Sequence, residues 1–283
     1  MIRLISVALA IVVAAALSGS IETEAGEPQT ALADCAAPPS LRLIEPTLTH
    51  VAARIDKGER LTIVAVGSSS TQGVGASAPS LNYPSRLEAE LRQRFPHIDI
   101  RVINRGKGGE DAPEELARMD RDVLAERPDL VIWQIGTNAV LRRDDLAADD
   151  ESIRRGVAMV QQRASDVVLM DMQFAPRVIG RPAAATMQRL IAQAAERSHV
   201  GLFRRFEIMR HWQLQPEPAQ MIGPDGLHMT DRGYACLAAE LAEAIAGNWR
   251  EHERSTQSAR SSLVAGLARP GDSPGDLYAN EDP

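Results

Sequence analysis

The sequence predicts an α/β fold, a flavodoxin-like three-layer α/β/α sandwich in which two layers of helices enclose a five-stranded parallel sheet. Short apolar runs alternate with helical patterns along the chain, which favours a parallel sheet with right-handed crossovers. The first run, over residues 61–66, is apolar without alternation, as in a strand buried on both faces. Polar and glycine residues follow the strand ends, where such sheets place their ligands.

The expected elements begin after Pro46, which precedes a helical apolar pattern that Gly58 closes. Strands are expected at residues 61–66, 98–104, 130–135, 167–172 and 200–203. Helices are expected from Pro84, from Pro113, over 153–162, over 183–197, and from Thr230 or Asp231 to about Trp249. Five strands in this alternation fit one flavodoxin-like domain.

Four segments divide the chain. Arg3, the apolar run 4–17 and the small residues after it are typical of a secretory signal peptide, expected here over residues 1–20. The run is shorter than the roughly 20 residues that span a membrane, although an uncleaved anchor stays open. We expect a linker over 21–44, one folded domain over 45–250 and a polar, disordered tail over 251–283. The mature protein is expected in the periplasm or the medium, without stable membrane association.

The two cysteines, Cys35 and Cys236, would meet an oxidising compartment after export, which permits a disulfide. Cys236 lies in the last expected helix, whose apolar face carries Tyr234, Leu237 and Leu241. At 100° per residue Cys236 falls on the opposite, outward side. An outward thiol in an exported protein is most simply explained by pairing, so a Cys35–Cys236 disulfide is a possible feature of the fold.

Composition argues against two classes of partner. The net charge of −7 and the pI near 5.5 do not suit a nucleic-acid surface. The histidines outside the motif described next show no ligand spacing, and no Cys-x-x-Cys is present, so no metal and no cofactor are expected.

Residues suited to nucleophilic catalysis recur after the expected strands: Ser69, Gly109, Asn138, Asp225 and His228. A serine hydroxyl becomes a nucleophile when histidine takes its proton. A carboxylate three residues before the histidine can hold the imidazole in the required tautomer. The Gly109 N–H, the Asn138 amide and the Ser69 N–H can stabilise an oxyanion.

These residues resemble the blocks of the SGNH (GDSL-type) hydrolases, in order and over most of the expected domain. The resemblance implies the SGNH hydrolase fold, with Ser69 as nucleophile, Gly109 and Asn138 in the oxyanion hole, and Asp225 and His228 completing a triad. Two positions depart from the family pattern. Ser68 stands where the first block commonly has Asp, and Ala139 where the third commonly has a second Asp. Neither departure removes a catalytic group.

A nucleotide site is the main structural rival. Residues 73–78 loosely match a dinucleotide fingerprint, but Pro79 and Pro84 delay the helix that it should open. Asn104 also stands where an acidic residue should end the second strand. Four further residues follow strand ends and could line a substrate crevice, although each is more often a surface or loop-anchoring residue: Arg142, Arg143, Gln173 and Arg177.

The signal-peptide pattern implies export, and the resemblance implies a serine esterase that forms an acyl-enzyme and acts on short-chain acyl esters, including O-acetylated carbohydrate. Two alternatives stay open: an acyltransferase with the same triad, and a catalytically silent carbohydrate-binding module. The set of Ser69, Asp225 and His228 favours the enzyme over the silent module, because a protein without activity has no reason to retain all three groups.

Overall fold

A computed structural model describes residues 35–142, 146–216 and 218–267 of the chain. The expected signal peptide and residues 21–34 of the expected linker lie outside these ranges. Within them, no helix is both long enough and apolar enough to cross a membrane.

Five parallel strands form the sheet, in the spatial order β2-β1-β3-β4-β5. This is the flavodoxin-like order, so the predicted fold class is confirmed. The strands are β1 (Leu61–Gly67), β2 (Ile100–Gly106), β3 (Leu130–Gln134), β4 (Asp166–Met170) and β5 (Gly201–Phe203). β1 lies between β2 and β3, with Ala65 beside Asn104 on one side and Ile132 on the other.

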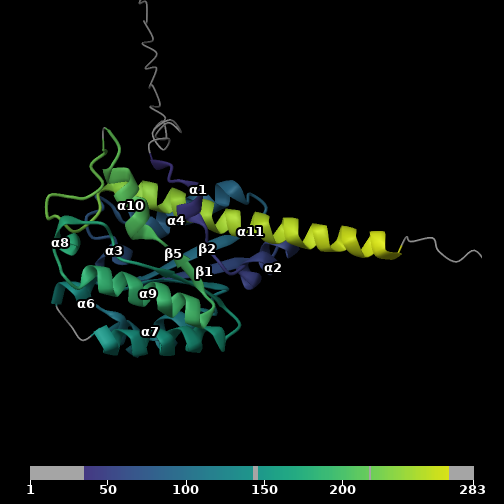
Figure 1. Ribbon diagram of the computed structural model, residues 1–283, viewed down its shortest axis with the longest axis horizontal. Coiled ribbons are helices and arrows are strands. Elements are labelled where there is room, and N and C mark those ends of the chain that lie inside the picture. The colour runs from purple at the N-terminus through teal and green to yellow at the C-terminus, as the bar shows by residue number, and fades with distance from the viewer. Residues whose placement is uncertain (1–34, 143–145, 217, 268–283) are drawn as a thin grey trace, which may run out of the picture. The chain divides into compact units, whose positions relative to one another are not determined.

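Helices cover both faces of the sheet (Figure 1). One face packs against α2 (Thr49–Lys57), α4 (Tyr83–Arg94), α10 (Arg205–Gln213) and α11 (Asp231–Leu267). The other packs against α5 (Ala112–Ala117), α7 (Leu146–Gln161) and α9 (Ala184–Ser198). Short helices complete the fold: α1 (Pro39–Arg42), α3 (Ser69–Gln72), α6 (Thr137–Arg142) and α8 (Pro176–Ile179).

Each buried strand divides its side chains between two hydrophobic cores. Ile63 and Ala65 point into the core beneath α4 and α11, while Val64 and Val66 point into the core beneath α5 and α7. All four side chains are fully buried, because successive residues of a strand face opposite sides of the sheet. The apolar run without alternation is therefore explained by burial on both faces.

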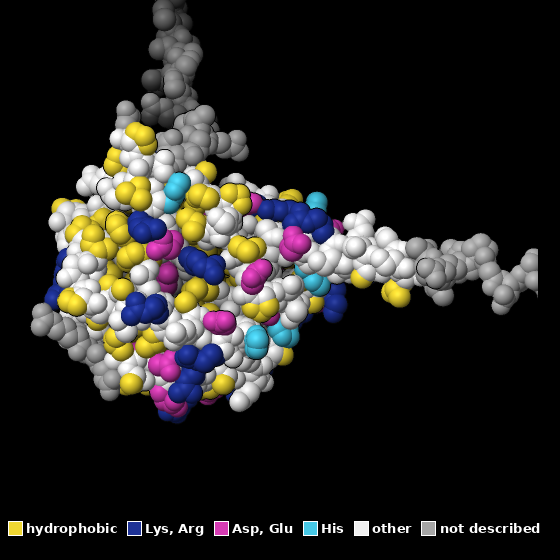
Figure 2. Space-filling model, in the orientation of Figure 1, with side chains coloured by type: hydrophobic (Ala, Val, Ile, Leu, Met, Phe, Trp, Pro, Cys, Tyr) yellow, Lys and Arg dark blue, Asp and Glu magenta, His cyan; other side chains and the backbone are white. Residues whose placement is uncertain are grey.

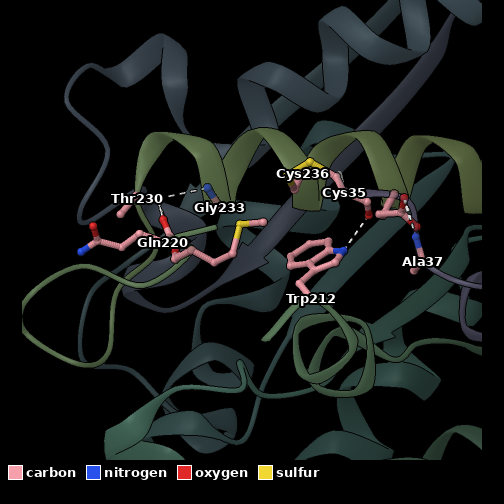
Figure 3. The surroundings of a disulfide bond; sticks show 9 residues. Cys35, Ala37, Trp212, Gln220, Thr230, Gly233 and Cys236 are labelled. Atoms are coloured by element: carbon pink, nitrogen blue, oxygen red, sulfur yellow. Dashed lines mark hydrogen bonds between the residues drawn. A yellow bond between two sulfur atoms is a disulfide. The ribbon is translucent and has the colours of Figure 1, made fainter. Parts of the chain in front are cut away.

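Capping residues mark the ends of three helices, and one of these residues, Asn82, was not predicted from the sequence. Gly58 adopts φ +65° after α2 and its N–H bonds back to the last turn. Asn82 caps α4 by accepting a hydrogen bond from the Ser85 N–H at 2.9 Å. At the start of α11, the Thr230 hydroxyl accepts from the Gly233 N–H at 3.2 Å (Figure 3). Thr230, rather than Asp231, is therefore the residue whose side chain caps this helix.

The expected linker differs from the structure over residues 35–44. Cys35, Ala37 and Ile44 are buried against the domain. The part from Cys35 to Leu48, here called the N-terminal segment, is bound to α11 through Asn248, whose side chain accepts from the Leu48 N–H and donates to the Ile44 carbonyl, each at 2.8 Å. The apolar side chains of this segment explain the difference, since they complete the core on that face of the sheet.

A disulfide joins Cys35 to Cys236, with the two Cα atoms 5.3 Å apart (Figure 3). The expectation that Cys236 faces outward is wrong, because its side chain is fully buried. The N-terminal segment covers the side of α11 that the helical pattern alone assigns to solvent. The Trp212 indole N–H donates to the Cys35 carbonyl at 2.6 Å and ties α10 to the same place.

The first part of the expected tail differs from expectation as well, while residues 268–283 lie outside the described ranges. Residues 251–267 continue α11 instead of being irregular, and the described side chains past Arg250 are mostly exposed. Arg254 pairs with Glu251 one turn earlier, which supports a helix that has few tertiary contacts.

Charged side chains of both signs lie side by side on the face in Figure 2. The described residues likewise form ion pairs at the surface, for example Arg197 with Asp150 at 2.8 Å and Arg60 with Asp99 at 2.6 Å. Such exposed pairs each contribute about 0–1 kcal/mol.

Candidate active site

The first site element is the turn from β1 into α3. Gly67 ends β1 at φ +154°, and a Cβ at this position would lie 2.9 Å from the Gln134 Cβ. Only glycine therefore fits here without displacing the neighbouring strand. Ser69 follows as the first residue of α3 and is partly exposed.

Gln134, at the end of β3, holds this turn, and the sequence reasoning missed it. Its side-chain oxygen accepts from the Ser68 N–H at 3.1 Å, from the Ser68 hydroxyl at 3.2 Å and from the Thr71 hydroxyl at 3.2 Å. Gln134 is 1% exposed. Ser68, the departure from the family pattern, is thus a buried contact of the turn.

His228 and Asp225 meet Ser69 across the rim of the sheet. The His228 Nε2 atom lies 2.9 Å from the Ser69 Oγ, and the His228 Nδ1 atom lies 2.5 Å from the Asp225 Oδ2. The other Asp225 oxygen accepts from the Leu227 and His228 N–H groups, each at 3.0 Å. Three residues separated by as many as 159 positions therefore form one hydrogen-bonded row.

The Asp225 carboxylate is held in its ionised form. Burial alone would raise its pKa, but the backbone N–H groups of Leu227 and His228 and the His228 ring lower the pKa to about 2. An ionised carboxylate accepts the Nδ1–H of the imidazole and leaves Nε2 free to face the Ser69 hydroxyl.

The loop after β2 approaches Ser69. The Lys107 N–H donates to the Gly67 carbonyl at 2.9 Å, and a Cβ on Gly108 would lie 3.8 Å from the Ser69 Cβ. Gly109 has φ +84°, with open space where a side chain would be. Glycine thus supplies both the required conformation and access to the backbone.

Asn138, in the first turn of α6, is brought against this loop. Its amide donates to the Glu110 carbonyl at 2.7 Å and is partly exposed. The Glu110 side chain is fixed in turn by Arg118 at 2.5 Å and by Lys107 at 2.8 Å. An Asn amide carries two N–H donors, so the bond to Glu110 leaves one available.

The four crevice candidates have separate outcomes. Arg142 anchors the loop, since it donates to the Gly109 carbonyl and pairs with Asp111 at 3.3 Å. Gln173 is fully buried and cannot line a crevice. Arg177 is exposed, and its backbone N–H donates to the Gly226 carbonyl beside Asp225. Arg143 lies outside the described residues.

Within the part of the chain that the structure describes, no group of three or more His, Cys, Asp or Glu side chains is arranged to hold a metal ion.

A groove of about 1080 Å³ lies away from Ser69, between the N-terminal segment, α9 and α11, and is lined by residues such as Leu43, His199 and Arg204. None of its lining residues belongs to the row of Ser69, His228 and Asp225.

Comparison with known families decides the classification. The model of the Non-GDSL lipase-like family matches residues 34–251. The chain belongs to this family. The match covers the sheet, the turn at Ser69 and the loop at His228, so the chain is an SGNH-like hydrolase, as the residues suggested.

Individual relatives agree with the family. An acetylxylan esterase of Geobacillus stearothermophilus is 26% identical over 215 residues, which cover 69% of this chain and 98% of the relative. An arylesterase of Vibrio mimicus is 24% identical, over 58% of this chain and 78% of the relative. Among solved structures, a two-domain esterase active on acetylated mannans is similar, with a TM-score of 0.62 and 26% identity over 74% of this chain. The match spans 56% of that esterase.

The family and the esterase relatives together assign the chain to the carboxylic ester hydrolases. The solved structures also agree with the three-layer fold derived above.

Proposed function

We propose that the protein is an exported serine esterase that removes short acyl groups, acetyl above all, from carbohydrate. Ser69 is the nucleophile, His228 the general base, and Asp225 the group that orients the imidazole. The observation that carries the proposal is the row with 2.9 Å from Ser69 to His228 and 2.5 Å from His228 to Asp225. Both distances are within the reach that proton transfer requires.

In the acylation step, the Ser69 oxygen attacks the ester carbonyl carbon while His228 takes the hydroxyl proton. The carbonyl oxygen becomes an oxyanion, for which the N–H groups of Gly109 and Ser69 and the Asn138 amide are the proposed donors. The intermediate then collapses: the bond to the sugar oxygen breaks, and His228 returns the proton to that oxygen. The free carbohydrate hydroxyl leaves, and Ser69 carries the acyl group.

In the deacylation step, water takes the place of the alcohol. His228 removes a proton from the water as it attacks the acyl carbon, and the same donors stabilise the second oxyanion. The bond to the Ser69 oxygen breaks, His228 protonates that oxygen, and the carboxylic acid is released. Asp225 keeps its charge throughout and stabilises the imidazolium.

The substrate class is supported by two relatives of similar identity, the acetylxylan esterase and the esterase active on acetylated mannans. The partly exposed positions of Ser69 and His228 suit an ester on a large carbohydrate. Aromatic residues make up 4% of the chain, which does not favour a long-chain lipase.

Export is supported by two features. The disulfide between Cys35 and Cys236 is typical of an oxidising compartment. The sequence of residues 1–20 has the basic start and apolar run of a signal peptide.

The proposal is tested by comparing the mature protein with Ser69→Ala on p-nitrophenyl acetate and then on acetylated xylo- and manno-oligosaccharides. We expect release of acetate by the wild type and a loss of at least about 10³-fold in Ser69→Ala. Equal rates for the two proteins would refute the nucleophile. Turnover of p-nitrophenyl acetate without release of acetate from any oligosaccharide would refute the substrate class alone.

A further inference from the structure

A buried cation lies beneath the active-site loops. Arg205, the first residue of α10, is fully buried. Its Nε–H donates to the Asp171 carbonyl at 2.9 Å, and its Nη2 donates to the Gln173 side-chain oxygen at 2.9 Å. Burial lowers the pKa of Arg205 to about 10, so the guanidinium keeps its charge at neutral pH. Burying such a charge is costly unless it is well hydrogen-bonded.

Gln173 connects Arg205 to both sides of the proposed site through hydrogen bonds. Its side-chain oxygen also accepts from the Thr137 hydroxyl at 2.8 Å, and its Nε2 donates to the Leu227 carbonyl at 3.4 Å. Thr137 directly precedes Asn138, and Leu227 directly precedes His228. One buried amide therefore contacts the neighbour of the proposed oxyanion donor and the neighbour of the proposed base.

The direction of these bonds depends on Arg205. A guanidinium has donors only, so it accepts nothing and requires an acceptor opposite it. Gln173 must therefore turn its oxygen toward Arg205 and Thr137, which leaves its NH₂ group facing the Leu227 carbonyl. A neutral residue at 205 would allow the amide to flip and would place two oxygen atoms against each other at Leu227.

Two tyrosines extend the contacts to the nucleophile. Tyr83 and Tyr234 are fully buried and lie within the electrostatic reach of Arg205. The Tyr83 hydroxyl shares a hydrogen bond with the Thr71 hydroxyl at 3.2 Å in α3, and the Tyr234 hydroxyl donates to the Val74 carbonyl at 2.7 Å. The segments that carry Ser69, Asn138 and His228 thus each form a hydrogen bond with Tyr83 or Gln173.

We propose that Arg205 and Gln173 are positioning residues that fix the His228 loop and the Asn138 helix relative to each other, an inference that rests on the proposed esterase function. Neither side chain reaches the reacting atoms. They keep the base and the oxyanion donor in fixed positions relative to each other. This matters because small displacements of either group lower the rate of the chemical step.

Gln173→Glu tests the His228 side. The variant keeps the oxygen that accepts from Arg205 and Thr137, but it replaces the donor to Leu227 with a second oxygen. We expect kcat on p-nitrophenyl acetate to fall 10- to 100-fold with KM within twofold of the wild type. The low-field proton resonance of the His228–Asp225 hydrogen bond should shift. An unchanged kcat and an unchanged resonance would overturn the proposal.

Thr137→Val and Thr137→Ser test the Asn138 side with little change in volume. Valine removes the hydroxyl that donates to Gln173, so kcat should fall about 10-fold while the His228 resonance stays as in the wild type. Serine keeps the hydroxyl and should restore kcat to within twofold. Equal kcat values for the valine variant and the wild type would contradict the proposal, even if Gln173→Glu does not fold.

The resonance also separates this inference from the proposed function. If wild type and Ser69→Ala hydrolyse esters equally, the esterase mechanism fails. A shift of the His228 resonance in Gln173→Glu would still show that Gln173 positions the loop, whereas an unchanged resonance would remove the positioning role.

Discussion

At the scale of the residue, four hydroxyl side chains follow β1, and the structure separates Ser69 from its neighbours. Ser68, Ser70 and Thr71 are 2%, 1% and 0% exposed. Ser69 is partly exposed and lies within hydrogen-bond distance of the His228 Nε2. The sequence alone left the choice among these hydroxyls to the family resemblance. The contacts now support Ser69 independently of it.

Asp225→Asn should fold normally and lose activity. The amide oxygen can still accept from the backbone, but the side chain no longer carries the charge that holds the imidazole tautomer, so kcat should fall about 10³- to 10⁴-fold, as for comparable triads. Asp225 is 45% exposed, so thermal stability should change little. Hydrolysis of p-nitrophenyl acetate and a thermal melt measure the two quantities. A variant with near-wild-type kcat would exclude Asp225 from the site.

Much of the site at this scale was predictable because it consists of chemically reactive residue types at strand ends. Gln134 and Arg205 were not assigned any role, and Gln173 was named only as a crevice candidate or a surface or loop-anchoring residue, although Gln173 and Arg205 follow strands. Their roles depend on which atom of a buried amide or guanidinium faces which neighbour. That information comes from packing between distant elements and leaves no pattern in the sequence.

At the scale of the element, the loop after α3 and the start of α11 hold the two halves of the row together. The Ser77 N–H donates to the Asp231 carboxylate at 2.8 Å. Gly75 has φ +96°, and a Cβ there would lie 2.4 Å from the Met229 carbonyl and 3.1 Å from the His228 Cβ. Close packing of these backbones therefore sets the distance between Ser69 and His228.

Gly75→Ala should therefore displace His228 and lower kcat by at least about 10-fold, because the added methyl group would overlap the Met229 carbonyl and press tightly on the His228 Cβ. Gly223→Ala is the matched control, since a Cβ there would meet its nearest atom, the His228 carbonyl, at an ordinary 3.5 Å. Steady-state kinetics on p-nitrophenyl acetate distinguish them. Similar kcat values for the two variants would show that Gly75 does not position the histidine.

Glu240 on α11 should make stability depend on pH. Burial raises the pKa of Glu240 to about 7 from 4.5, although Arg42 favours its ionised form. The folded protein then binds this proton more tightly than the unfolded chain, so stability should fall as pH rises from about 4.5 to 7 and then level off. Burial also raises the pKa of Asp171 to about 7. This carboxyl group should therefore also make stability fall as pH rises.

Glu240→Gln should remove part of that dependence, reducing the fall in unfolding free energy between pH 4.5 and 8 by roughly 1 to 3 kcal/mol. Glu251→Gln on the same helix is the control, since that side chain is 65% exposed and pairs with Arg254. Urea denaturation at several pH values measures both. An identical pH profile for Glu240→Gln and the wild type would contradict the assignment.

The elements show where sequence patterns suffice and where they do not. Strands buried on both faces, such as β1 and β3, stand out as apolar runs. The partly exposed edge strand β2 was found from its alternating apolar residues instead, so that all five strands were found. The prediction that Cys236 faces outward was wrong because helical periodicity cannot reveal that the distant N-terminal segment packs over that face. The continuation of α11 beyond Trp249 was missed for a related reason, since polar residues suit an exposed helix and an irregular tail equally.

At the scale of the whole molecule, the disulfide closes the fold across 201 positions. Replacing both Cys35 and Cys236 with alanine should lower the free energy of unfolding by roughly 2 to 5 kcal/mol, since a long loop then regains its freedom in the unfolded chain. Activity at 25 °C should stay within a few-fold, because neither residue contacts the site.

Calorimetry with and without a reductant measures the effect. The reduced wild type should resemble the double variant. Two free thiols in the unreduced, denatured wild type, or an unchanged melting temperature in the double variant, would contradict the disulfide.

The central claim is that groups from opposite ends of the domain converge to activate one serine. Labelling with a fluorophosphonate, followed by peptide mapping, tests it most directly. We expect one phosphonate per chain, on the peptide that contains Ser69, and no label in Ser69→Ala or His228→Ala. Stable label on another serine, or an equal rate of labelling in His228→Ala, would contradict the account.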